Sequence, residues 1–205
     1  MTRPFLGIGP LTNLQDARSS AAVGFQHISF SLERGQTRML GSNLIWNIAS
    51  WLSGPEIIVE LNAISLPELD QLGNPKQLGG ILFPLAEVEA LREVGFAALP
   101  TNRIMLRVGP EDQGISAAIE LVESLGYEVD LLAMQVEEPA KWEAFAERVY
   151  LHFNHLETSR SFVQTPSWTP KGIWLGPEAE EEFGLLHYEA IDDWIETIND
   201  HWEEE

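Results

Sequence analysis

Segments typical of strands and of helices alternate along the whole chain, and this alternation limits the possible folds more than any other feature. The strand-like segments are short apolar runs over residues 5–8, 24–32, 56–61, 80–85, 103–108, 129–136, 149–153 and 172–175. Between them, apolar residues recur at the three- and four-residue spacing of a helix face. Because the strands are nearly continuous in apolar residues, they predict a parallel sheet that helices cover.

About eight such strand–helix units predict an α/β protein with a (β/α)8 barrel, formed as a single domain over residues 1–205. A length of 205 residues is at the small end for this fold. An open, doubly wound sheet is the alternative, since it is assembled from the same units. Asn13 is a residue type that caps helices, and Gly54-Pro55 is expected to end another helix.

The chain is strongly acidic, with 32 acidic and 12 basic residues and a formal net charge of −20. Such a surface repels phosphate groups, so neither nucleic acid nor an anionic membrane is expected as a partner. No apolar run reaches the roughly 18 residues of a membrane-spanning helix. The first residues also lack the apolar core of a signal peptide. A cytoplasmic protein is expected, and its oligomeric state is left open.

Motifs for metals and common cofactors are missing from the sequence. It contains no cysteine, so neither disulfides nor thiol chemistry are expected. It also lacks zinc-ligand spacing, a P-loop and the glycine motif of dinucleotide-binding folds. We therefore expect no metal and no cofactor.

The two ends of the chain carry motifs that can be compared with known proteins. Residues 7–17 read Gly-Ile-Gly-Pro-Leu-Thr-Asn-Leu-Gln-Asp-Ala, and residues 172–178 read Gly-Ile-Trp-Leu-Gly-Pro-Glu. They resemble the first strand of phosphoribosylanthranilate isomerase, Lys-Ile-Cys-Gly-Ile-Thr-Asn-x-x-Asp-Ala, and its last strand with the following loop. The resemblance implies a TIM barrel. It also implies the family's reaction, the Amadori isomerisation of N-(5-phosphoribosyl)anthranilate in tryptophan biosynthesis.

The residues that carry this chemistry in the family are replaced here. The rearrangement needs an acid to open the furanose ring and a base to remove a proton from the adjacent sugar carbon. By resemblance, the cysteine base falls on Gly9, and the aspartate acid falls on Gln135 in the predicted sixth strand. Neither a glycine nor an amide titrates in the useful range, so the catalytic residues are unknown.

The family's phosphate site is also altered. The resemblance implies backbone N–H groups from glycine-containing loops after the seventh and eighth strands. Residues 150–155 contain no glycine pair, Pro177 has no N–H, and Glu178 repels a dianion. The sequence therefore predicts an isomerase-like barrel whose catalysis is impaired or repurposed.

Four other residues are candidates for binding a small molecule. Arg38 matches, by resemblance, the arginine that holds the anthranilate carboxylate. Glu60, Arg107 and His152 lie near the ends of the third, fifth and seventh strands, and the carboxyl ends of barrel strands meet on one face. The alternatives are an internal ion pair or solvent exposure for Glu60 and Arg107, and a structural or surface role for His152. For Arg38, the alternative is a loop arginine that pairs with an acid.

Three interpretations of function follow. The chain is an impaired isomerase, an enzyme with new chemistry at Glu60, Arg107 and His152, or a non-enzymatic binding or assembly protein on the same scaffold. A deep polar pocket at the strand ends would favour the enzymes. A barrel mouth plugged by Trp174 and Phe153 would favour the binding protein.

Overall fold

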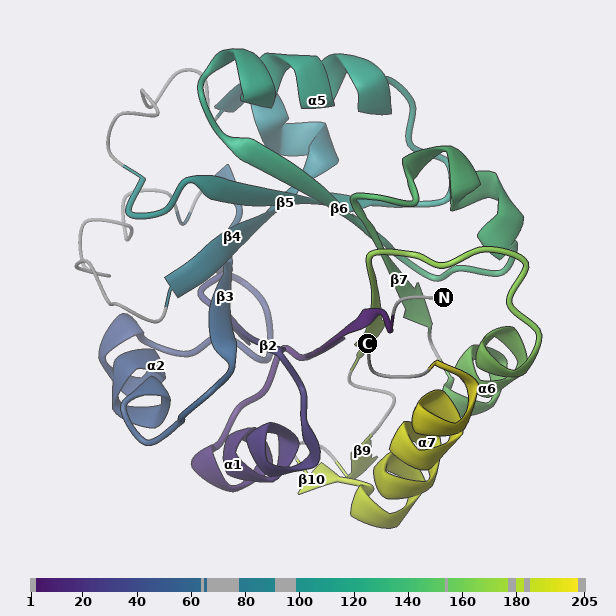
Figure 1. Ribbon diagram of the computed structural model, residues 1–205. Helices are drawn as coiled ribbons and strands as arrows, with labels where there is room; N and C mark the ends of the chain where they lie inside the picture. The colour runs from purple at the N-terminus through teal and green to yellow at the C-terminus, as the bar shows by residue number, and fades with distance from the viewer. Residues whose placement is uncertain are drawn as a thin grey trace.

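A closed barrel of parallel strands forms the centre of the molecule. The structure, a computed structural model, describes residues 3–63, 65, 78–90, 99–153, 155–176, 180–182 and 185–202. Strands β1 to β8 pair in chain order, and β8 pairs with β1 through Phe5 opposite Gly172 and Ile8 opposite Leu175. Figure 1 shows these strands as a ring with the helices outside it. The predicted (β/α)8 barrel is confirmed, and the open sheet is excluded.

Most strands lie where the sequence placed them. They are β1 (Phe5–Ile8), β2 (His27–Ser31), β3 (Glu56–Glu60), β4 (Leu78–Pro84), β5 (Arg103–Val108), β6 (Glu128–Ala133), β7 (Val149–Phe153) and β8 (Gly172–Leu175). Three of them are shorter than predicted: β3 by one residue, and β2 and β6 by more. Phe25 precedes β2, because its backbone N–H donates a hydrogen bond of 3.1 Å to the Ser20 carbonyl at the end of α1, while its ring stacks on Trp194 of the last helix. Gln135 lies beyond β6, because its backbone turns to a positive φ of 53°.

Helices cover the outside of the barrel. They are α1 (Leu14–Val23), α2 (Ser42–Ala49), α5 (Ile115–Ser124), α6 (Leu156–Gln164) and α7 (Tyr188–His201), with 3-10 helices η2 (Leu85–Glu87) and η4 (Pro139–Phe145). Pro139 lies in the first turn of η4, where a helix accepts a proline. As predicted, Asn13 caps α1: its side chain accepts a hydrogen bond of 2.8 Å from the Asp16 N–H. None of the described helices is long and apolar enough to span a membrane.

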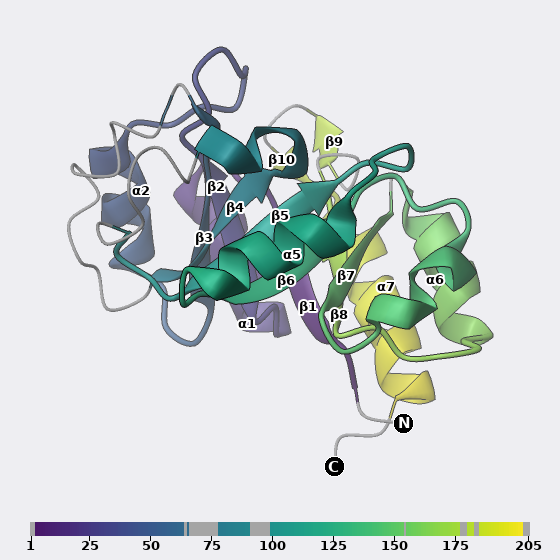
Figure 2. The same cartoon turned by 90° about the horizontal axis from the view of Figure 1, so that it is seen from above.

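The arrangement outside the barrel is visible in two views. Helix α5 lies over β5 and β6, and α6 and α7 pack side by side (Figures 1 and 2). The Trp194 indole of α7 donates a hydrogen bond of 2.9 Å to the Ser159 hydroxyl of α6, and both side chains are buried. A short antiparallel pair, β9 (Glu180–Glu182) and β10 (Leu185–Leu186), lies between β8 and α7 in the chain.

The interior of the barrel consists of three layers, because alternate residues of each strand point inward. At the amino ends of the strands, Arg103 contacts Glu56, Asp130 and Tyr150. An apolar middle layer follows, made of Ile58, Leu82, Met105, Leu132, Tyr150 and Trp174. At the carboxyl ends, the inward residues are again polar.

Two glycines make room for the largest rings of this interior. A Cβ atom on Gly7 would lie 2.1 Å from the Trp174 ring, and one on Gly172 would lie 2.2 Å from the Tyr150 ring. Each glycine is the register partner of the residue that fills its space. Trp174 therefore fills the middle of the barrel beneath its carboxyl-terminal mouth.

Candidate functional site

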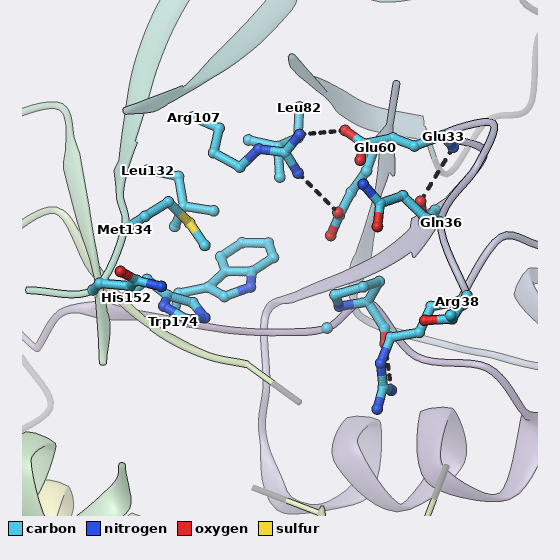
Figure 3. A pocket seen from close by; sticks show the side chains of 15 residues that line it. Glu33, Gln36, Arg38, Glu60, Leu82, Arg107, Leu132, Met134, His152 and Trp174 are labelled. Carbon is cyan, nitrogen blue, oxygen red and sulfur yellow. Dashed lines mark hydrogen bonds and ion pairs between the residues drawn. The ribbon is translucent and has the colours of Figure 1, made fainter. Parts of the chain in front are cut away.

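A cavity of about 350 Å³ opens at the carboxyl ends of the strands. The candidate residues Arg38, Glu60, Arg107 and His152 all line it, as do Gly9 and Gln135. Figure 3 shows Arg38, Glu60, Arg107 and His152 around a common space, together with Trp174. Because β-strands of a barrel present their carboxyl ends to one face, residues from β3, β5 and β7 meet here although they are far apart in sequence.

Arg107 is held between two carboxylates. Its guanidinium donates a short hydrogen bond to Glu33, and its Nη1 atom lies 3.6 Å from Oε2 of Glu60 (Figure 3). Both acids are almost fully buried, whereas the arginine side chain is 24% exposed. The ion pair considered for Glu60 and Arg107 is therefore present, with Glu33 as the closer partner.

Glu60 is anchored from behind. The buried Ser29 hydroxyl donates a hydrogen bond of 2.6 Å to Oε1 of Glu60. Burial raises the pKa of Glu60 above its ordinary value, while the positive charge of Arg107 and the Ser29 hydrogen bond act in the opposite direction. A carboxyl group with a raised pKa that faces a cavity is able to gain and lose a proton.

Glu33 is the member of the site that the sequence did not single out. It follows β2, and its backbone N–H donates a hydrogen bond of 3.1 Å to the Ser31 hydroxyl at the end of that strand. A serine at a strand end with an acid two residues later is a local turn pattern, and it was the available signal. The pairing with Arg107, 74 residues away, leaves no local trace in the sequence.

Arg38 reaches the cavity from the loop after β2. Its Nη1 atom donates a hydrogen bond of 3.4 Å to the Pro10 carbonyl oxygen, next to the end of β1. Figure 3 shows the Arg38 side chain on the same side of the cavity as Gln36. The arginine therefore lies at the rim of the cavity, and its role in holding a carboxylate remains a prediction.

Gly9 occupies a place that has no room for a side chain. Its φ angle is +140°, a conformation that side chains rarely adopt. A Cβ atom here would lie 2.2 Å from the Ser29 Oγ atom and 2.8 Å from the Ser29 carbonyl oxygen. At this position, which the resemblance assigns to the family's base, the space that a side chain would need is taken by Ser29, the serine that anchors Glu60.

Gln135 does not lie where a catalytic residue at the end of a strand would lie. It lies two residues beyond β6, is exposed, and has a φ of 53°. Its neighbours are anchored: the Met134 N–H donates to the Val108 carbonyl at 2.8 Å, and the Val136 N–H donates to the His152 carbonyl at 3.0 Å. The turn at Gln135 thus forms part of the cavity wall between β6 and β7.

The mouth is not plugged by Trp174 and Phe153. Trp174 lies at the base of the cavity, and Phe153 packs against Phe162 of α6, with ring centroids 5.7 Å apart. His152, its neighbour on β7, is buried and lines the cavity. Alternation along the strand explains this difference, because adjacent residues point to opposite faces. Among the described residues, no group of histidines and acids has a metal-binding arrangement.

The positions after β7 and β8 that the resemblance assigns to phosphate binding are only partly described. His155 is exposed at the start of α6. Asn154, Pro177 and Glu178 lie outside the described residues, so the prediction about the phosphate loops remains a prediction.

No protein-family model and no curated protein sequence matches this chain. Solved structures do match it. A phosphoribosylanthranilate isomerase in complex with reduced 1-(O-carboxyphenylamino)-1-deoxyribulose 5-phosphate has a TM-score of 0.72 at 16% identity, covering 98% of this chain and 100% of that one. TrpF from Jonesia denitrificans has a TM-score of 0.73 at 15% identity, covering 96% and 97%.

The match also extends to another enzyme with a related barrel. A phospho-2-dehydro-3-deoxyheptonate aldolase from Thermotoga maritima has a TM-score of 0.73 at 10% identity, and the alignment covers 97% of this chain and 68% of that one. At such identities the likeness concerns the fold. The resemblance seen in the terminal motifs is confirmed at that level: this chain has the fold of the phosphoribosylanthranilate isomerases.

Proposed function

We propose that this chain is a phosphoribosylanthranilate isomerase-like barrel that does not catalyse the family's Amadori rearrangement and that uses its mouth for a different small molecule. The observation that carries this proposal is the crowding at Gly9. A base at this position needs a side chain, and the space for its first carbon is taken by Ser29. The missing base therefore belongs to a rearranged site in which Ser29 supports Glu60.

Two further features support the loss of the isomerase reaction. Gln135, at the position of the family acid, carries an amide that does not deliver a proton near neutral pH. A net charge of −20 also disfavours a phosphorylated substrate unless local cations offset the field. Neither Pro177 nor Glu178 supplies a cation for a phosphate, and Pro177 has no backbone N–H to donate.

The cavity itself supports binding of a small molecule. It is a concave space of about 350 Å³ with charged residues on its walls and an aromatic base, within the usual range for ligand sites. A protein used only as a scaffold for assembly has no need to bury Glu60 and Glu33 beside such a space, because buried charges are costly. The interpretation as an assembly scaffold is therefore weaker than the interpretation as a barrel that binds a small molecule.

Complementation tests the proposal directly. We expect this gene not to restore growth without tryptophan to a bacterial strain that lacks phosphoribosylanthranilate isomerase, whereas an authentic isomerase gene in the same vector restores it. Purified protein should likewise leave N-(5-phosphoribosyl)anthranilate unchanged in a chromatographic assay. Growth or turnover with the unmodified protein would overturn the proposal.

A double variant, Gly9→Cys with Gln135→Asp, sharpens the test. It reintroduces a base and an acid, which are each worth about 10²–10⁴-fold in rate when correctly placed. We expect it to remain inactive, because the cysteine would collide with Ser29 and the phosphate would still meet Glu178. Clear activity of this variant would mean that the cavity still accepts the family's substrate.

A further inference from the structure

We propose that Glu60 is a general acid–base and that the cavity acts on a small uncharged hydroxycarbonyl compound, a free aldose or ketose, by moving a proton between adjacent carbons. This inference rests on the proposed function, since it assigns a chemistry to the same cavity. It places the proton-transfer groups on β3, β5 and β7, in place of the positions on β1 and β6 that the resemblance implies.

The position of Glu60 suits proton transfer. One carboxyl oxygen accepts the hydrogen bond from Ser29, which fixes the group in place. The other oxygen lies 3.6 Å from Arg107, farther than a hydrogen bond, and is therefore available to a substrate. Glu60 is 4% exposed but lines the cavity, so a bound molecule reaches its carboxyl group while bulk water is largely excluded.

Arg107 provides a fixed positive charge beside this carboxyl. Its hydrogen bond to Glu33 holds the guanidinium at the cavity wall. A preorganised cation stabilises negative charge that develops on an oxygen during a reaction, and such electrostatic stabilisation is large where water is excluded. His152, buried and also lining the cavity, is a second group able to carry a proton to or from an oxygen.

The balance of charges favours an uncharged substrate. Among the described residues, the carboxyl and guanidinium groups that line the cavity are Glu33, Glu60, Arg38 and Arg107, two acids against two arginines. Its other walls include the neutral hydrogen-bonding side chains Ser31, Gln36, Thr37 and Gln135. Hydroxyl groups of a sugar match such a wall, because each is both a donor and an acceptor.

The approach to the cavity discourages anions. A neighbouring groove of about 470 Å³ shares Met134 and Gln135 with the cavity. Its walls carry four acids against one lysine: Glu111, Asp112, Glu137, Glu138 and Lys141. A phosphorylated sugar that entered along this side would be repelled, whereas a free sugar would not.

The proton transfer balances without another reactant. The Glu60 carboxylate removes the proton from the hydroxyl-bearing carbon next to the carbonyl. The electron pair of that C–H bond forms a carbon–carbon double bond, and the carbonyl oxygen takes up negative charge beside Arg107. Glu60 then returns the proton to the neighbouring carbon while a hydroxyl proton passes between the two oxygens. The product is the isomeric sugar.

Hydrogen–deuterium exchange tests this chemistry and binding together. D-ribose, D-xylose and D-glucose are each incubated with the protein in D2O, and proton NMR follows loss of the C2 proton signal. Saturation-transfer NMR on the same samples reports binding separately. We expect exchange with at least one of these sugars and none with ribose 5-phosphate.

Two variants on one strand assign the effect to Glu60. Glu60→Gln keeps the size of the side chain but removes the titrating group, and it should lower the exchange rate by about 10²-fold or more while the sugar still binds. Glu56→Gln changes the same residue type at the other end of β3, away from the cavity, and should leave the rate unchanged. If circular dichroism shows that Glu60→Gln does not fold, Glu60→Asp replaces it, with the carboxylate drawn back by one methylene group and a lower exchange rate expected.

Each negative result has a distinct meaning. Binding of a sugar without exchange, or equal exchange by wild type and Glu60→Gln, would overturn the catalytic assignment but leave the proposed function standing. Absence of binding by all three sugars, or exchange confined to ribose 5-phosphate, would overturn the uncharged substrate class. Failure of the proposed function would show itself elsewhere, as growth in the complementation assay.

Discussion

At the scale of single residues, Gly9 is held in a conformation and a space that exclude other residues. At this position, which the resemblance assigns to the family's base, the difference from the family is therefore more than the exchange of one side chain for another. A new side chain at Gly9 has to overcome both a φ of +140° and the contact with Ser29. The two costs are separable, because Gly24 has a φ of +102° with nothing within 4 Å of its absent Cβ atom.

We therefore expect Gly9→Ala to lower the free energy of unfolding by about 3 kcal/mol, from backbone strain and crowding together. Gly24→Ala, the matched control, should lower it by about 1 kcal/mol, from strain alone. Urea denaturation of both variants measures the difference. Equal losses in the free energy of unfolding at the two glycines would mean that Ser29 moves aside freely. Crowding would then not exclude a side chain at Gly9.

At the scale of elements, the seam between β1 and β8 depends on one small and one large residue in register. Trp174 occupies the space beside Gly7, so a larger residue at position 7 would crowd the indole ring. We expect Gly7→Ala to cost about 1–3 kcal/mol of stability by overpacking. Gly41→Ala is the control, since an added Cβ atom there meets nothing within 4 Å and the residue has a negative φ of −75°.

A double variant distinguishes crowding from other causes. Trp174→Leu alone leaves a void, and in combination with Gly7→Ala the added methyl group enters that void. The combined loss in the free energy of unfolding should therefore be smaller than the sum of the two single losses. A strictly additive result in thermal or urea unfolding would show that Gly7 and Trp174 do not compete for the same space.

At the scale of the whole molecule, the barrel has polar groups at both ends of its interior, and we expect the amino-terminal end to be sensitive to acid. His27 is buried there, with Nε2 at 3.2 Å from Glu56 and 3.3 Å from Arg103. Burial, together with the positive charges of Arg103 and Lys171, lowers the pKa of His27 from 6.5 to about 3. The Tyr150 ring packs edge-on against it.

The direction of the pH effect follows from this lowered pKa. Between pH 6.5 and about 3 the unfolded chain binds a proton at His27 that the folded chain does not. Stability therefore falls as the pH falls through this window, by up to about 1.4 kcal/mol per pH unit. His27→Gln, which does not titrate, should lose less stability than wild type between pH 7 and pH 5. Urea titrations at each pH measure this difference, and identical profiles for wild type and His27→Gln would contradict the assignment.

Patterns along the sequence predict the number and order of the barrel strands and three of the cavity residues. Periodicity records which side of each element is buried, and parallel strands bring their carboxyl ends to one face. Strand topology therefore placed Glu60, Arg107 and His152 at the same mouth, and the family resemblance added Arg38. The limits of β2 and β6 were less certain, because apolar residues such as Phe25 also serve contacts outside the sheet.

Only the tertiary structure decided how those residues interact. It paired Arg107 with Glu33, placed Ser29 in the space beside Gly9, and turned Phe153 away from the mouth. These outcomes depend on strand register and on barrel closure, which bring together residues that no local pattern relates. The chemistry of the mouth is therefore a property of contacts across the barrel, while the barrel itself is a property of patterns along the chain.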